Sequence, residues 1–317
     1  MSKLNKKTIL VTGCAGFVGS NLVDFYLNKN FKVIGIDNFS TGLKENLKKA
    51  LKNKKFKLVK ADLLKDKDLG KLFENVDIVF HLAANADVRF GPDNPKRDLE
   101  QNLIVTSNVL EFMRINKVKK IIFSSTGSVY GEATQFPTPE NAKFPIQTSF
   151  YSASKLACEG LISSYAEAYN FKCWIFRFVS LLGPRYSHGH VIDFYNKIKI
   201  GKKLDVLGNG NQNKSYIHIY DCINAMHISY KFFKKKINII NIGNNYSITV
   251  KQSLKQIQKL LKSNIKPTFQ NNNRGWIGDN PYILLSTRKL RTSGWKPKYS
   301  IMESISHTLD FLKKNNL

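Results

Sequence analysis

The sequence predicts an α/β protein with a doubly wound parallel β-sheet and a second, smaller lobe of mixed α and β structure. Three observations support this prediction. Short apolar runs alternate with amphipathic segments as far as Gly183, which is the pattern of parallel strands joined by covering helices. A glycine-rich turn joins the first run to the first amphipathic segment. Beyond Gly183 the alternation breaks down, which indicates a separate lobe.

The elements of the large domain follow from the period of the apolar residues. A helix is predicted at 17–28, because Val18, Leu22, Phe25 and Tyr26 recur at helical spacing. A long helix is predicted around 98–116, and a third contains Tyr151. The strands are predicted where short apolar runs end at polar or small residues, at 8–12, 31–36, 56–60, 77–82, 119–123 and 173–178.

The second lobe is predicted from shorter and less regular segments. Its strands are expected near 205–207, 215–219 and 237–242, and its helices near 191–200, 221–233 and 249–261. We found no repeat, no low-complexity tract and no clear linker between the two parts. We therefore expect the lobes to pack closely together.

Composition limits the class of protein. A chain of 317 residues with 42% hydrophobic content can bury a large core in one or two domains. No apolar stretch approaches the ~20 residues that cross a bilayer, so no membrane partner is expected. The 4 cysteines are scattered, without a C-x-x-C pair or metal-ligand spacing. We therefore expect reduced thiols, a cytoplasmic location and no metal site.

The net charge of +27 is the unusual feature of the composition. The lysines are spread along the chain and are not interleaved with aromatic residues, so a nucleic-acid partner is not expected. Joint enrichment in Lys, Asn and Ile is typical of a codon bias toward A and T. A positive field would still favour an anionic substrate.

The segment from Thr12 to Gly19 spells T-G-x-x-G-x-x-G between a predicted strand and a predicted helix. Gly13 permits a tight turn, Gly16 lets the backbone approach a pyrophosphate, and Gly19 lets the helix lie close to the strand. The start of the helix supplies unpaired N–H groups and the positive end of a dipole. This segment predicts a dinucleotide site.

Polar and small residues at the ends of the next strands refine that prediction. Asp37 ends the second strand, where it can accept hydrogen bonds from both ribose hydroxyls and would repel a 2′-phosphate; NAD is therefore favoured over NADP. Asp62 follows the third strand, where it can reach an adenine amino group or cap the segment that begins at Leu63. Ala83 and Ala84 leave room for the cofactor or pack tightly.

Tyr151 and Lys155 form a Y-x-x-x-K motif on one face of a predicted helix. A tyrosine with its ordinary pKa of about 10 is a poor base at neutral pH. A nearby ammonium and a positive nicotinamide ring would favour the phenolate and lower the pKa of Tyr151. Lys155 can also hold the nicotinamide ribose. Together with the glycine motif upstream, this pair predicts a redox enzyme that uses a nicotinamide cofactor.

With these motifs and others, the chain resembles the extended short-chain dehydrogenase/reductase family, and within it the nucleotide-sugar epimerases and dehydratases. The matching segments run over nearly the whole chain, at 12–19, 37–42, 81–88, 123–131, 151–155, 183–185 and 274–279. The resemblance implies a Rossmann domain over residues 1–183 and a nucleotide-sugar-binding lobe over 184–317, with an approximate boundary and interleaved lobes.

The residues expected to contact NAD are Gly13, Gly16, Phe17, Val18, Asp37, Asn38, Asp62, Leu63, Ala83, Ala84, Tyr151 and Lys155. The catalytic residues implied by the resemblance are Thr126, Tyr151 and Lys155, where the Thr126 hydroxyl binds the sugar C4 oxygen. Sugar 4,6-dehydratases carry an Asp-Glu pair in the two positions after this threonine, and nucleotide-glucuronate decarboxylases a glutamate in the second. Gly127 and Ser128 cannot do that acid–base work, so a 4-epimerase is favoured.

The implied mechanism is a reversible oxidation at C4 of the sugar. Tyr151 removes the 4-hydroxyl proton while C4 delivers a hydride to NAD. The 4-keto sugar turns over in the pocket, the hydride returns to its other face, and Tyr151 returns the proton. NAD is regenerated in every cycle and can stay bound.

The residues expected to contact the nucleotide sugar are Asp87, Thr126, Ser180, Arg185, Lys214 and Arg274. Arg185 and Arg274 are the candidate cations for the diphosphate. Lys214 stands where UDP-hexose epimerases have an arginine, so it keeps the charge but loses the bidentate fork. Ser180 stands where the family usually has an asparagine. These two departures leave the identity of the nucleotide open.

Three functions are weighed for this chain. The first is a UDP-hexose 4-epimerase. The second is a net nucleotide-sugar 4-dehydrogenase that gives a 4-keto product, for example from a GDP-linked hexose or heptose. The third, a non-catalytic dinucleotide sensor, is disfavoured by the intact catalytic residues. The resemblance also implies a homodimer, formed through the helix before the fifth strand and the Tyr151 helix.

Overall fold

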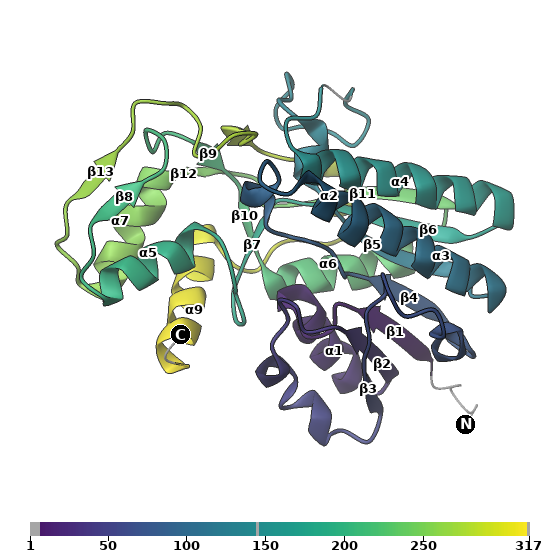
Figure 1. The fold of residues 1–317 in the computed structure, drawn as a ribbon. Coiled ribbons are helices and arrows are strands. Elements are labelled where there is room, and N and C mark those ends of the chain that lie inside the picture. Colours follow the sequence, from purple (N-terminus) through teal and green to yellow (C-terminus); the bar gives the residue numbers. More distant parts are fainter. Residues whose placement is uncertain (1–6, 144–145, 316–317) are drawn as a thin grey trace.

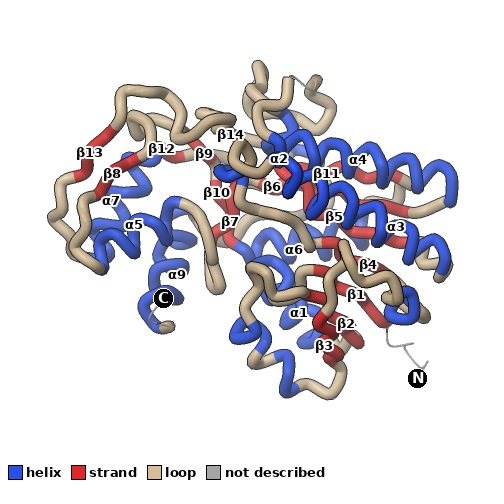
Figure 2. The backbone as a smooth tube through the Cα atoms, viewed as in Figure 1, coloured by secondary structure: helices blue, strands red, loops and turns tan. Residues whose placement is uncertain are grey.

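The computed structural model describes residues 7–143 and 146–315. Its centre is a seven-stranded sheet in the order β11-β6-β5-β4-β1-β2-β3, in which every pair of neighbours is parallel (Figures 1 and 2). The strands of this sheet are β1 (Thr8–Thr12), β2 (Lys32–Asp37), β3 (Phe56–Lys60), β4 (Ile78–His81), β5 (Lys120–Thr126), β6 (Lys172–Phe178) and β11 (Ile237–Ile242). The prediction of a doubly wound parallel sheet is confirmed.

Alternate side chains of the sheet enter two separate cores. In β1, Ile9 and Val11 join one core and Leu10 joins the other, as the period of two along a strand requires. The first core lies under α1 (Phe17–Asn28) and α6 (Ile219–Phe232), which contact each other. The second lies under α3 (Val105–Ile115) and α4 (Phe150–Tyr169). Helices therefore cover both faces, which explains the buried apolar runs at 9–11, 78–80 and 121–123 in the inner strands (Figure 1).

Several elements differ from the sequence-based expectation. The helix expected at 221–233 in the smaller lobe is α6, which covers the sheet of the large domain. The strand at 237–242, expected in the smaller lobe, is β11 and pairs with β6 in the main sheet. The physical reason is that α6 is a crossover helix that covers the sheet between these two strands, so residues beyond 183 complete the large domain. The long helix expected around 98–116 is divided into α2 (Pro95–Asp98), a π-helical turn (Leu99–Ile104) and α3.

The smaller lobe lies beside the carboxyl end of the sheet, at the left of Figure 1. Three helices form it and contact one another: α5 (His190–Lys199), α7 (Val250–Leu261) and α9 (Ile301–Lys314). Its short strands pair as β7 (Ser180–Leu182) with β10 (Tyr216–His218), β8 (Leu204–Val206) with β13 (Pro267–Phe269), and β9 (Asn213–Lys214) with β12 (Ile248–Thr249) and β14 (Tyr282–Ile283). A one-turn helix, α8 (Arg288–Arg291), lies against β11.

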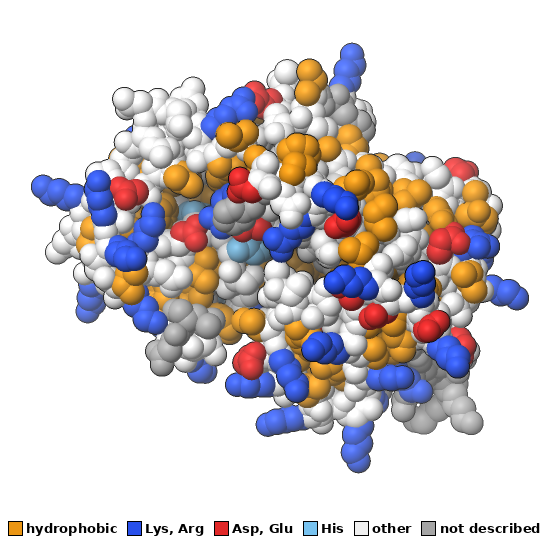
Figure 3. All heavy atoms as spheres, viewed as in Figure 1, with side chains coloured by type: hydrophobic (Ala, Val, Ile, Leu, Met, Phe, Trp, Pro, Cys, Tyr) orange, Lys and Arg blue, Asp and Glu red, His pale blue; other side chains and the backbone are white. Residues whose placement is uncertain are grey.

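Three further observations concern the classes of partner. Within residues 7–143 and 146–315, no helix combines the length and apolar character of a membrane span. The same residues hold no group of three or more His, Cys, Asp or Glu side chains arranged for a metal ion. Basic side chains are scattered over the face shown in Figure 3 and do not gather in one patch.

Candidate active site

A cavity of about 1060 Å³ lies between the carboxyl edge of the main sheet and the smaller lobe. Figure 3 shows this region as a hollow between the two parts of the molecule. Pockets for a single small ligand are typically about 300 to 1,000 Å³, so this cavity has room for a large or composite ligand. All twelve residues expected to contact NAD line it.

The glycine turn is shaped by close packing at two of its three glycines. Gly13 has a φ of 67°, and a Cβ there would lie 2.8 Å from the Ala83 nitrogen. A Cβ on Gly19 would lie 2.0 Å from the Gly13 oxygen, so α1 approaches β1 as closely as it does only because residue 19 is glycine. Gly16 is the N-cap of α1 and makes no side-chain capping bond, which leaves the first N–H groups of the helix for an anion.

Thr12 and His81 join the glycine turn to the next strand, a link that sequence reasoning missed. The Thr12 hydroxyl accepts hydrogen bonds from the Leu82 and Ala83 nitrogens, both at 3.1 Å, so its own proton goes to His81 Nδ1 at 2.8 Å. His81 Nε2–H then donates to Thr106 Oγ1 at 3.0 Å. Burial, with the charge of Lys155 adding to it, lowers the pKa of His81 to about 3, so the ring is neutral.

The two aspartates of the cofactor end have different surroundings. Asp37 is buried, and its two carboxylate oxygens accept from the Ala15 and Phe39 nitrogens, both at 2.8 Å. These bonds hold the carboxylate against the glycine turn, where a ribose would lie. Asp62 Oδ1 accepts from the Leu64 nitrogen at 2.9 Å, which is the capping contact considered from the sequence, and Asp62 also lines the cavity.

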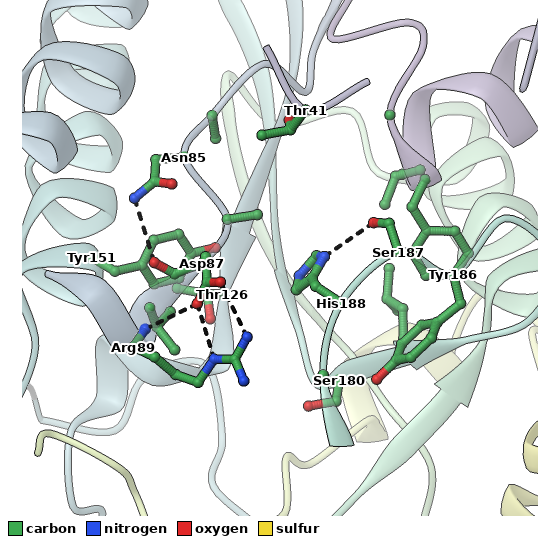
Figure 4. Close-up of a pocket in the computed structure, with 18 of the residues that line it drawn as sticks. Thr41, Asn85, Asp87, Arg89, Thr126, Tyr151, Ser180, Tyr186, Ser187 and His188 are labelled. Carbon is green, nitrogen blue, oxygen red and sulfur yellow. Dashed lines mark hydrogen bonds and ion pairs between the residues drawn. The ribbon is translucent and has the colours of Figure 1, made fainter. Parts of the chain in front are cut away.

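The three catalytic candidates meet in the middle of the cavity. Thr126 is the last residue of β5, and Tyr151 lies in the first turn of α4, one turn before Lys155. The Thr126 hydroxyl accepts from the Ser128 nitrogen at 3.1 Å, and Thr126 is close enough to lower the pKa of Tyr151. Figure 4 shows the Thr126 and Tyr151 side chains side by side. Lys155 is 2% exposed and donates to the Ser124 oxygen at 2.9 Å.

The protein's own groups keep Tyr151 protonated. Burial raises the pKa of Tyr151 above its usual value, Asp98 raises it further, and the hydrogen bond from Thr126 lowers it only in part. The expected lowering of this pKa by Lys155 is not found. Lys155 is itself desolvated, and burial lowers its pKa to about 8 against the raising influence of Cys158, Glu159 and Asp98.

A polar network behind Tyr151 was also missed by sequence reasoning. Asn102, in the π-helical turn, donates to Ser154 Oγ at 2.8 Å, and Ser154 donates to the Tyr151 carbonyl oxygen at 2.8 Å. Asn85 and Asn102 both donate to Asp98 Oδ1, at 2.8 and 3.3 Å. The second oxygen of Asp98 is buried and has no hydrogen-bond partner. A buried carboxylate that is satisfied on one side only therefore lies close to the phenol.

The end of β5 is held by a buried ion pair on the side away from the cavity. Arg177 Nη2 lies 2.6 Å from Glu159 Oε2, and both side chains are almost fully buried. Glu159 also accepts a hydrogen bond from Ser125, the residue before Thr126. Arg177 continues the network by donating to the Tyr130 hydroxyl at 2.7 Å. These contacts fix the strand that carries Thr126 against the helix that carries Tyr151.

The residues expected to contact substrate divide into two groups. Asp87, Thr126, Ser180 and Lys214 line the cavity, and Lys214 pairs with Asp279 and lies 4.8 Å from the ring centre of Trp276.

Within the described chain, the cavity lining includes neither Arg185 nor Arg274. Arg185 faces the other way and pairs with Asp24 of α1 at 2.6 Å. The exposed Arg274 pairs with Glu132. Both arginines therefore meet a carboxylate nearby, although Arg185 Nη1 is buried without a hydrogen-bond partner.

Three features meet at one edge of the parallel sheet: the glycine turn, the buried Asp37 and the helix with Tyr151 and Lys155. Together they define a dinucleotide-dependent redox enzyme of the short-chain dehydrogenase/reductase type. The model of the NAD dependent epimerase/dehydratase family matches residues 9–243. The chain belongs to that family. Membership confirms the resemblance stated from the sequence, the NAD cofactor and an enzyme of the nucleotide-sugar epimerase type.

Individual relatives match this chain along nearly the full length of both proteins. UDP-glucose 4-epimerase of Mycolicibacterium smegmatis is 30% identical over 315 residues, which cover 97% of this chain and 99% of that protein. The structure of UDP-glucose 4-epimerase from Thermotoga maritima with UDP-glucose matches with a TM-score of 0.88 and 30% identity, over 98% of this chain and 100% of that one. UDP-glucuronic acid 4-epimerase from Bacillus cereus, in complex with UDP-glucuronic acid and NAD, matches with a TM-score of 0.89 and 28% identity, over 97% and 99%.

Proposed function

We propose that this protein is an NAD-dependent UDP-hexose 4-epimerase, which inverts C4 of a nucleotide-activated sugar. One observation carries the proposal. The adjacent side chains of Thr126 and Tyr151 lie between a dinucleotide-binding edge and a second lobe, within one continuous cavity (Figure 4). A sugar placed there would meet a hydroxyl donor and a phenol at the same carbon.

The residues of the cofactor end fit NAD. The tight approach of α1 to β1 leaves the first turn of the helix open to a pyrophosphate, and buried Asp37 faces the position of a ribose. When bound, NAD supplies a hydride acceptor and donor for C4 of the sugar. Tyr151 removes the 4-hydroxyl proton and later returns it, and Thr126 orients the C4 oxygen. The positive charge of a bound nicotinamide ring would favour the phenolate during the first half of the cycle.

The two positions after Thr126 favour epimerisation over dehydration. Ser128 lines the cavity and has no acid function, while a Cβ on Gly127 would lie 3.1 Å from Leu285 Cδ1 and 3.2 Å from the Phe178 oxygen. The packing around Gly127 therefore leaves little space for the acidic side chain that elimination of water would require. The names of the full-length relatives from Mycolicibacterium smegmatis and Thermotoga maritima support the same reaction.

We infer that the nucleotide sugar is contacted by Asp87, Thr126, Ser180 and Lys214 from the two sides of the cavity. The pairing of Lys214 with Asp279, beside Trp276, supports a diphosphate or nucleotide subsite in the smaller lobe. Contacts from Arg185 and Arg274 stay predictions from the resemblance, because each now pairs with an acid away from the lining. The four buried free cysteines support the predicted cytoplasmic location.

Product analysis tests the reaction. The purified protein is incubated with UDP-glucose and with GDP- and dTDP-linked hexoses, while absorbance at about 340 nm reports NADH and mass spectrometry reports the product. The proposal expects an isomer of unchanged mass from UDP-glucose and no net NADH. A product two hydrogens lighter, with one equivalent of NADH, would replace the epimerase by the 4-dehydrogenase.

Replacing the phenol tests the proposed base. Tyr151→Phe is expected to lower kcat by roughly 10²- to 10⁴-fold, because it removes the group that moves the C4 hydroxyl proton. The NAD content of the purified protein is expected to stay unchanged, since the dinucleotide edge is intact. Wild-type kcat in this variant would remove Tyr151 from the base role, and loss of NAD would show that the substitution disturbed the cofactor site instead.

A further inference from the structure

Arg89 holds two carboxylates together across the cavity. Its Nε and Nη2 donate to the two oxygens of Asp87, each at 3.2 Å, in a forked contact. Its Nη1 donates to Oδ2 of Asp193 at 3.0 Å, and Asp193 lies 104 residues further along the chain than Arg89. Asp87 and Arg89 belong to the large domain, and Asp193 lies on α5 of the smaller lobe. We call these three residues the Arg89 cluster.

The Arg89 cluster lies at the sugar end of the cavity. All three members line the cavity together with Thr126 and Tyr151. Figure 4 shows Asp87 and Arg89 directly beside Thr126 and Tyr151, with His188 facing them across the space. Because C6 of a hexose is only two bonds from C4, a substituent on C6 falls close to whichever groups surround the catalytic pair.

The net charge of the Arg89 cluster itself is negative. Its two carboxylates against one guanidinium leave one net negative charge, while Arg97, Lys155 and Lys197 line other parts of the cavity. Burial opposes ionisation of Asp87, but the hydrogen bonds and charge of Arg89 hold its pKa below the usual value. Burial lowers the pKa of His188, with Asp87 and Asp193 opposing and Arg89 adding to that effect, so the ring is neutral at pH 7. Lys197 and Lys214 are cations of the smaller lobe that line the cavity; Lys214 is paired with Asp279, and Lys197 donates to the Asp205 carbonyl oxygen at 2.8 Å.

We propose that Asp193 is a specificity-determining residue: by occupying Arg89 together with Asp87, it restricts the substrate to nucleotide sugars with an uncharged C6 group and excludes nucleotide hexuronates. The hydroxymethyl group of a hexose donates a hydrogen bond to a carboxylate oxygen of the cluster. The carboxylate of a hexuronate meets like charge there, and Arg89 is already engaged. The inference rests on the proposed nucleotide-sugar function and adds the class of sugar to it.

Binding measurements on the NAD-loaded protein test this assignment. Dissociation constants for UDP-glucose and UDP-glucuronate are measured by calorimetry on the wild type and on Asp193→Asn, which keeps the shape of the side chain and removes its charge. Asp193→Ser is a second neutral variant, and Asp193→Glu retains the charge. Asp310→Asn, an exposed position on α9 of the same lobe, is the matched control. The rate of epimerisation is followed in parallel.

The wild type is expected to bind UDP-glucose roughly tenfold or more tightly than UDP-glucuronate. The neutral variants are expected to narrow the ratio of the two dissociation constants by roughly five- to tenfold, because the charge at residue 193 no longer repels the sugar carboxylate. Partial exposure of Asp193 keeps the effect moderate. Asp193→Glu and Asp310→Asn are expected to keep the wild-type ratio. Equal or tighter binding of UDP-glucuronate by the wild type, or an unchanged ratio in both neutral variants, overturns the assignment. Selective binding of UDP-glucose without turnover of either sugar would support the role of Asp193 and would contradict the proposed epimerase reaction instead.

Discussion

Tyr151 is a phenol whose surroundings resist its ionisation, although the proposed reaction needs it as a base. Burial and the carboxylate of Asp98 raise its pKa, and Thr126 is the protein group that lowers it. The cationic nicotinamide ring of bound NAD would then supply the missing stabilisation of the phenolate. Such an arrangement makes the phenolate available only when the oxidant is in place, so proton removal is coupled to hydride removal.

Asp98 offers a direct test of this balance. Because a negative charge raises the pKa of a neighbouring phenol, Asp98→Asn is expected to lower the pKa of Tyr151. The acid limb of the profile of kcat/KM against pH would then move to lower pH, by roughly half a unit to one unit. The side chain keeps its shape, and its oxygen can still accept from Asn85 and Asn102.

The matched control for this prediction is Asp93→Asn, an exposed aspartate in the loop before α2. Its acid limb is expected to coincide with that of the wild type. An unmoved limb in Asp98→Asn, or a shift toward higher pH, would show that Asp98 does not act on the phenol.

At the scale of single elements, the close approach of α1 to the glycine turn requires that residue 19 has no side chain. A side chain at residue 19 would collide with the carbonyl of Gly13, and this carbonyl belongs to the turn that receives the pyrophosphate. The hydrogen bonds from the Gly13 nitrogen to the Ile36 oxygen at 2.8 Å and from the Gly16 nitrogen to the Gly13 oxygen at 3.2 Å hold that turn in shape. The hydrogen bonds and the close packing therefore join α1, the glycine turn and β2 into one unit.

Gly19→Ala is expected to weaken NAD binding by roughly thirtyfold, which corresponds to about 2 kcal/mol of overpacking, and to lower the thermal midpoint. Gly160→Ala is the matched control, because a Cβ there would meet no atom within 4 Å in the middle of α4. The control is expected to keep NAD affinity and to gain roughly 0.5 to 1 kcal/mol of stability. Fluorescence titration with NAD and thermal denaturation measure both. Equal NAD affinity in the two variants would contradict the packing argument.

The π-helical turn at 99–104 shows how a local irregularity serves the site. It interrupts the helix expected from the sequence and places Asn102 where its side chain reaches both Asp98 and Ser154. Such turns carry one extra residue per turn and are frequent at functional sites. Hydrophobic periodicity did not reveal it, because the apolar residues on both sides still follow a helical spacing.

At the scale of the whole molecule, three exposed apolar side chains remain on the outside of the large domain. We call Ile104, Ile115 and Tyr169 the apolar stripe. Ile104 and Ile115 are 41% and 63% exposed and lie 11 residues apart, about three helical turns along α3 and the preceding π-turn, so they share a face. Tyr169 adds an exposed aromatic ring at the end of α4. We infer that this stripe is the surface of the predicted homodimer.

Ile104→Lys is expected to convert a dimer into a monomer, because it places a charge within the apolar stripe. Ile200→Lys is the matched control, since Ile200 is 60% exposed at the end of α5 in the other lobe. Light scattering coupled to size-exclusion chromatography gives the mass of each. A monomeric wild type, or a dimer that survives Ile104→Lys and dissociates in Ile200→Lys, would place the interface elsewhere or remove it.

What the sequence by itself determined is local chemistry at the ends of strands. The T-G-x-x-G-x-x-G turn, Asp37 and the Tyr151–Lys155 spacing each follow from a few consecutive residues, and parallel strands bring such ends to one edge of a sheet. For this reason the fold class, the family and the NAD cofactor were predicted correctly. All twelve residues expected at the cofactor lie at the cavity.

Only the tertiary structure decided how distant residues meet. Three features depend on how the helices pack against the sheet and the smaller lobe. They are the contact of Arg89 with Asp193, the pairing of Arg185 with Asp24, and the place of 237–242 in the main sheet. The electrostatic surroundings of Tyr151 were decided in the same way, because burial and Asp98 outweigh a lysine that is close in sequence. A sequence pattern shows only how residues are spaced along the chain. Desolvation and ion pairs between distant residues arise only when the packed elements exclude water.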